Sequence, residues 1–218
     1  MAVKHVDPYE KTLLDKMMFI IYFLMIFFGF PTLAFYAICN FISQYYGYSK
    51  YGYSLGTLLS IVFIAIILTY RYTVKSYKTR TNILIDSFRS DLAFEPTPEC
   101  EFYTQREYIG IDTKRGTIVY IGHPHDLSKD VFLMAFDNNN WRRAELINST
   151  IPAVRIYTNY PNIPYITFTG KKAPRIFDII SAMRGKNYQY DVSNPGYVEY
   201  KAEQAANEHG FNLILPRA

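Results

Sequence analysis

The sequence has little of what common catalytic and metal sites require. It contains only two cysteines, Cys39 and Cys100, and four histidines among 218 residues. The two cysteines lie in different parts of the chain and lack ligand spacing, so neither a disulfide nor a cysteine metal site is expected. The patterns GxSxG and HExxH and the phosphate-binding P-loop are missing as well. We therefore predict no catalytic residue, no metal ligand and no cofactor.

Charged side chains are missing from two long windows, Met17–Ser49 and Tyr51–Tyr70. About 20 apolar residues suffice to cross a hydrocarbon core roughly 30 Å thick. We expect two transmembrane helices over about residues 17–42 and 53–70, which make residues 1–80 a membrane hairpin. A cleaved signal peptide is the alternative interpretation, but no small-x-small cleavage site ends the first apolar run.

The basic residues predict how such a hairpin is oriented. The positive-inside rule puts both termini in the cytoplasm, the short connection outside and four basic residues at the membrane surface after the second span. Gly52, Gly56 and Ser60 are small residues four apart, so the first span, or a second copy in a homo-oligomer, could pack closely against them. The flanking basic residues are Lys4, Lys11 and Lys16 before the first span and Arg71, Lys75, Lys78 and Arg80 after the second.

The connection between the two windows is rich in tyrosine. Tyrosine is common at membrane interfaces, where its ring is buried and its hydroxyl stays hydrated. It is equally suited to recognition loops, because it offers rigid amphipathic contact area at low entropic cost. Both interpretations, an aromatic belt and a partner-binding loop, stay open. The tyrosines are Tyr45, Tyr46, Tyr48, Tyr51 and Tyr53.

Beyond the second window, the pattern predicts a separate cytoplasmic α+β domain over residues 81–218. The helix should continue to about Phe88, before the prolines of FEPTPE. A hairpin with Gly116 in its turn and further short strands follow, and the segment KKAPRIFDIISAMRG predicts an amphipathic helix that closes the sheet. The expected strands are Tyr108–Asp112, Thr117–Ile121, Val131–Phe136, Trp141–Leu146, Val154–Thr158 and Tyr165–Thr169, with a last helix over Tyr197–His209.

Two short runs are candidates for chemistry or recognition. His123, His125 and Asp126 resemble metal ligands, but no further histidine or cysteine lies nearby, which favours an ordinary polar loop. Trp141, Arg142 and Arg143 could offer a cationic, aromatic surface to lipid headgroups or to an acidic partner. In the simpler interpretation, Trp141 is a core or rim residue of the sheet and the two arginines face water. The net charge of +4 gives no reason to expect a nucleic-acid partner.

Four segments carry a resemblance to known proteins. The order YIGIDTKRGTIVYIG, NNNWRRAEL, VRIYTNYPNIPYITF and IFDIISAMRG resembles a bacterial pleckstrin-homology-like (PH-like) domain, a curved antiparallel sheet closed by a helix. Together with the paired apolar windows and the start MAVKHVDPYEKTLLDKMMFIIYF, the whole chain resembles the entry-exclusion proteins of I-complex conjugative plasmids. These are bacterial inner-membrane proteins that stop a cell from acquiring a plasmid it already carries.

The resemblance implies a function by recognition, not by catalysis. The expected partner is a membrane protein of the donor's transfer apparatus, in addition to the lipid bilayer itself. The alternative is a membrane-tethered lipid-binding or scaffold module of a secretion or transfer complex. An enzyme is the third hypothesis, disfavoured because no catalytic motif is present.

Overall fold

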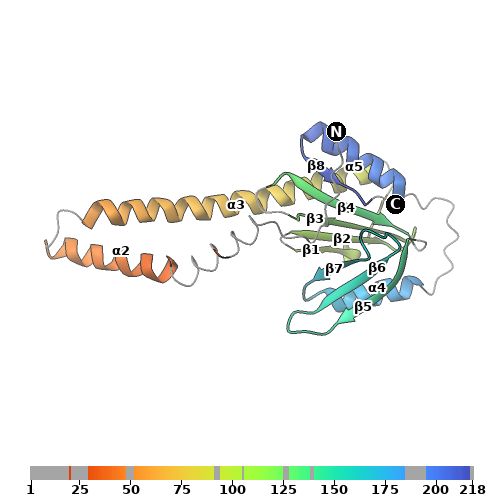
Figure 1. Cartoon of the computed structure of the whole chain (residues 1–218), viewed down its shortest axis with the longest axis horizontal. Coiled ribbons are helices and arrows are strands. Elements are labelled where there is room, and N and C mark those ends of the chain that lie inside the picture. The colour runs from red at the N-terminus through yellow and green to blue at the C-terminus, as the bar shows by residue number, and fades with distance from the viewer. Residues whose placement is uncertain are drawn as a thin grey trace. The chain divides into compact units, whose positions relative to one another are not determined.

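A computed structural model of the chain describes residues 20, 29–47, 52–90, 94–104, 106–124, 128–137, 140–184 and 195–216. The described residues divide into two compact units, one of residues up to 75 and one of residues from 76 onward. Helix α3 contributes to both units (Figure 1).

The first unit is helical. It contains α2 (Phe30–Tyr45) and the first part of α3 (Gly52–Ser90). Among the described residues, no helix combines the length and the apolar character that crossing a membrane requires.

This finding overturns the expected transmembrane hairpin, and with it the expected two-pass localisation in the inner membrane. Residues 17–19 and 21–28 of the first expected span lie outside the described residues.

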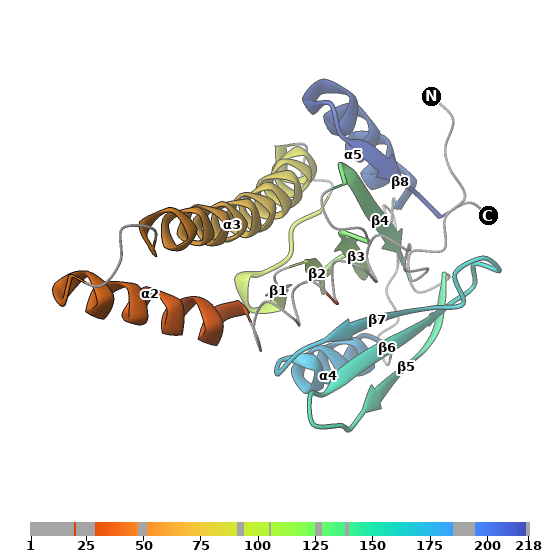
Figure 2. The ribbon, with the colours of Figure 1, turned by 60° about the vertical axis from the view of Figure 1, so that its left-hand side comes forward.

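The second unit has an α+β fold with two separate sheets (Figures 1 and 2). Sheet A has the order β1-β2-β3-β4-β8; its neighbours are antiparallel except β4 and β8, which are parallel. Sheet B is antiparallel with the order β5-β6-β7. The strands are β1 (Glu101–Tyr103), β2 (Glu107–Asp112), β3 (Thr117–Gly122), β4 (Asp130–Phe136), β5 (Trp141–Ile147), β6 (Ala153–Thr158), β7 (Tyr165–Thr169) and β8 (Asn212–Ile214).

The strands predicted from the sequence are confirmed, but their assembly into one PH-like sheet closed by a helix is wrong. The last strand, β8, pairs with the free edge of β4. Strand β5 does not pair with sheet A and instead starts the second sheet. The predicted continuation of the second helix to about Phe88 is also confirmed, since α3 ends at Ser90.

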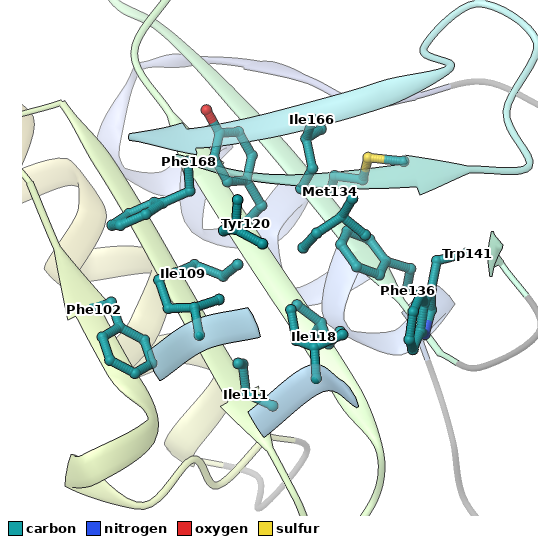
Figure 3. Close-up of a cluster of buried hydrophobic side chains, with 14 of the residues drawn as sticks. Phe102, Ile109, Ile111, Ile118, Tyr120, Met134, Phe136, Trp141, Ile166 and Phe168 are labelled. Atoms are coloured by element: carbon teal, nitrogen blue, oxygen red, sulfur yellow. The ribbon is translucent and has the colours of Figure 1, made fainter. Parts of the chain in front are cut away.

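Sheet A is buried on both faces, which explains why β4 is apolar along almost its whole length. Side chains alternate between two clusters, with Met134 in one and Leu133 in the other. The first cluster lies between sheet A, sheet B and α4 (Ala173–Arg184), and Figure 3 shows part of it. The second lies between sheet A, the end of α3 and α5 (Pro195–His209). A short 3-10 helix, η2 (Pro98–Cys100), precedes β1.

The close packing of the second cluster makes Gly110 sensitive to substitution. A Cβ atom at Gly110 would lie 2.2 Å from the Tyr108 hydroxyl and 2.9 Å from the Phe94 ring, and both rings are fully buried. Gly110→Ala should therefore lower the free energy of unfolding by roughly 1–3 kcal/mol, the usual cost of overpacking a core. Urea denaturation of the full chain, followed by the emission of its one tryptophan, measures this loss.

Gly170 supplies the matched control. A Cβ atom there would meet its nearest neighbour, the Phe168 ring, at 3.7 Å, an ordinary contact. Gly170→Ala should leave the urea midpoint nearly unchanged. If Gly110→Ala and Gly170→Ala lowered the free energy of unfolding equally, the crowding around Gly110 would not explain the loss of stability.

Candidate interaction surface

A β-bulge separates the three residues of the Trp141, Arg142, Arg143 run. The register between β5 and β6 shifts between Trp141 and Arg143, as happens where one strand accommodates an extra residue. Trp141 is buried in the first cluster, where its ring lies beside Phe136 (Figure 3). Both arginines are exposed. The structure thus places the tryptophan in the core and the arginines at the surface.

Arg143 lies on a face of sheet B that also carries two tyrosines. Its guanidinium lies 4.4 Å from the centre of the Tyr157 ring, the residue directly opposite on β6. Arg155 lies 4.6 Å from the centre of the Tyr165 ring on β7. Side chains one residue away, such as Ile156 and Ile166, point into the core. We call the residues Arg143, Glu145, Arg155, Tyr157 and Tyr165 the outer face of sheet B.

Contacts within the outer face hold its side chains in place. The Tyr157 hydroxyl donates a hydrogen bond of 2.8 Å to Glu145 Oε2. The Tyr157 and Tyr165 rings meet edge to face, with centres 6.1 Å apart. Arg142, beside the face, donates from Nε to Asn159 Oδ1 at 2.7 Å. Stacked guanidinium groups lose little further freedom on binding, because their rings already restrict them.

The predicted tyrosine loop is only partly described. Tyr45 and Tyr46, at and after the end of α2, are 80% and 64% exposed, and their rings meet edge to face with centres 5.3 Å apart. Tyr48 and Tyr51 lie outside the described residues, and Tyr53 lies within α3. Tyr45 and Tyr46 therefore present a large aromatic area to the surroundings.

The four basic residues expected at a membrane surface all lie in α3. Arg71, Lys75 and Lys78 are exposed. Arg80 is half-buried, because its guanidinium donates to the Ser128 carbonyl oxygen and to the Ser76 hydroxyl, both at 2.9 Å. Arg80 thus joins α3 to the segment before β4.

His123 is part of the core packing. It is 5% exposed, its ring stacks on Tyr77 with centres 4.6 Å apart, and its Nε2 lies 3.0 Å from the Thr81 hydroxyl. Burial, and next the positive charge of Arg80, lower the pKa of His123 to about 4. His125 and Asp126 lie outside the described residues, and the described part of the chain has no group of three metal-ligating side chains.

Sequence reasoning missed Glu145, Arg155, Tyr157 and Tyr165. The signal was present in part, because alternation along Val154–Thr158 and Tyr165–Thr169 puts arginine and tyrosine on the polar side of each strand. What joins them is strand pairing: Tyr157 lies opposite both Arg143 and Tyr165. Pairing between strands cannot be deduced from the spacing of residues within one strand.

The comparisons with known proteins yield one match. The family model described as exclusion-determining protein matches residues 8–218, nearly the full chain. No curated protein and no solved structure matches. The match confirms the resemblance to entry-exclusion proteins that was drawn from the sequence, but it does not extend to a PH-like domain. The chain belongs to the exclusion-determining protein family.

Proposed function

We propose that the chain performs its role in plasmid entry exclusion by binding a membrane protein of the donor's transfer apparatus, without catalysing a reaction. The exclusion-determining family, whose model matches residues 8–218, supports the exclusion role and is not an enzyme family. The chain would then refuse one plasmid and accept another because it binds the transfer protein of the first donor more tightly than that of the second. Local contacts carry this difference in binding free energy.

The composition of the outer face of sheet B favours a function in binding another protein. Arginine and tyrosine are enriched among the residues that dominate binding energy in protein interfaces. The outer face contains two of each, already stacked in cation–π pairs at 4.4 Å and 4.6 Å. The exposed Tyr45 and Tyr46 offer a second aromatic surface in the other unit.

A mating assay tests the function directly. Recipients with and without the chain receive either the cognate plasmid or an unrelated one, and the frequency of transfer is counted. The chain should lower transfer of the cognate plasmid and leave the unrelated plasmid unaffected. Equal transfer of the cognate plasmid into both recipients would refute the exclusion role.

Exchanging segments with a relative of different specificity should then redirect which plasmid is refused. We predict that residues 76–218, which carry the outer face, transfer the specificity. The boundary at Ser76 keeps Tyr77 and Thr81 with His123, which they contact. Exchange of residues 45–53 alone is the comparison, and redirection by that exchange alone would assign specificity to the tyrosines of the helical unit.

A further inference from the structure

The two arginines of the outer face share a single acidic side chain, Glu145, which lies opposite Arg155 in the strand register and acts on its charge. Arg89 pairs with Glu101 at 2.7 Å, and Arg175 pairs with Glu99 at 3.3 Å. Among the described carboxylates, none forms an ion pair with Arg143 or Arg155; these two guanidinium groups instead lie over tyrosine rings. The outer face therefore carries the positive charges of two arginines against the single negative charge of Glu145, and its net charge is positive.

A guanidinium stacked on a ring keeps the chemistry needed to bind a carboxylate. The ring covers one side of the plane, whereas the N–H groups lie in the plane and point away from its edge. Such a fork matches the two oxygens of a carboxylate. Arg143 lies over the Tyr157 ring and Arg155 over the Tyr165 ring, and the two arginines come from adjacent strands, so two carboxylates of one extended segment could be bound together.

We propose that the outer face of sheet B binds an acidic segment of a partner protein, an inference that rests on the proposed function and names its surface. The tyrosines favour a protein over other anions, because Tyr157 and Tyr165 add apolar contact area between the charges. Nucleic acid fits less well. The face includes the exposed Glu145, held by Tyr157, which would repel a phosphate backbone, and it contains no lysine.

Charge reversal in the mating assay tests the proposal. The double substitution Arg143→Glu with Arg155→Glu should raise transfer of the cognate plasmid into the recipient by at least about tenfold, toward the frequency in recipients without the chain. Arg143→Gln with Arg155→Gln removes the charge without adding repulsion and should raise transfer less. Glu145→Gln removes the one acid from the face and should keep exclusion intact or strengthen it.

A control variant also replaces two positive side chains with glutamate, but at positions of the same unit outside the outer face. Lys114→Glu with Lys171→Glu replaces two exposed lysines, one in the β2–β3 turn and one before α4. This variant should exclude the plasmid like the unchanged chain. Immunoblotting of each recipient, and tryptophan emission of the purified full chain, show that the variants accumulate and keep the buried environment of Trp141.

The outcomes separate this inference from the function on which it rests. If the unchanged chain does not exclude the plasmid, the proposed function fails. If it excludes and both arginine double variants exclude equally well, the acidic-segment proposal is overturned. Loss of exclusion with Glu145→Gln, or an equal loss with the lysine control, also overturns it. So does binding of a single-stranded oligonucleotide by the full chain that the arginine reversal abolishes, because the face would then be a nucleic-acid site.

Discussion

Replacing Asp112 with alanine should lower the free energy of unfolding by roughly 3–5 kcal/mol. Its carboxylate is fully buried at the start of the β2–β3 turn. One oxygen accepts hydrogen bonds from the backbone N–H groups of Lys114 and Arg115, at 3.0 and 3.1 Å. The other accepts from the Glu95 N–H and the Arg115 guanidinium, both at 3.1 Å. Alanine would leave all four donors without this acceptor.

The same carboxylate connects the hairpin to the segment that follows α3, because Glu95 stands next to the buried Phe94. The loss should therefore appear in the cooperative unfolding of the unit, measured by urea denaturation of the full chain with Trp141 emission as the signal. Asp112→Asn keeps one acceptor oxygen and should cost less than Asp112→Ala. Lys114→Ala, an exposed side chain in the same turn, is the matched control, and a loss as large as that of Asp112→Ala would contradict this explanation.

Lowering the pH from 6.5 to 4 should destabilise the fold by about 3 kcal/mol through His123 alone. The pKa of His123 is about 4 in the folded chain, mainly because burial disfavours the charged imidazolium and next because Arg80 repels it. The positive charge of Arg106 acts in the same direction. In the unfolded chain the pKa returns to its ordinary value near 6.5.

The sign follows from which state binds the proton. Between pH 4 and 6.5 the unfolded chain is protonated at His123 and the folded chain is not, so stability rises with pH across this window. Above pH 6.5 the histidine adds no pH dependence. Burial raises the pKa of Glu199 to about 7, which gives the opposite slope between pH 4.5 and 7. The His123 contribution must therefore be measured as a difference between two chains.

His123→Gln provides that difference. Glutamine does not titrate, and its amide can still form a hydrogen bond with the Thr81 hydroxyl, the present partner of His123 Nε2. Urea denaturation of both chains at several pH values should show that the histidine chain loses more stability than the glutamine chain on going from pH 6.5 to 4. Parallel curves for the two chains would show that His123 does not carry the effect.

The structure also changes how the histidine run can be tested. Alanine at His123 would remove a buried ring that packs on Tyr77, so loss of exclusion by that variant would report the fold as readily as a metal. Glutamine, which preserves most of the side-chain volume, is therefore the appropriate substitution. Spacing along the sequence groups His123 with His125 and Asp126, because spacing carries no information about which side chains are buried.

Local structure was largely determined by the sequence itself. Period-two alternation, turn residues such as Gly116, and the apolar stripe of Ala173–Arg184 predicted the strands and helices, because these features act over a few neighbouring residues. Family membership was determined by the sequence as well, over residues 8–218. The transmembrane hairpin was inferred from apolar composition, and the structure of the described residues overturned it.

Only the tertiary structure decided how these elements assemble. The strands form two sheets, and the parallel pairing of β8 with β4 joins residues about 80 positions apart, such as Asp130 and Asn212. The bulge at Arg142 turns Trp141 into the core and leaves Arg143 outside. Register then sets Arg143, Tyr157 and Tyr165 side by side. These outcomes depend on which strand edges remain free after the chain has folded, and side-chain periodicity within a single strand carries no information about distant edges.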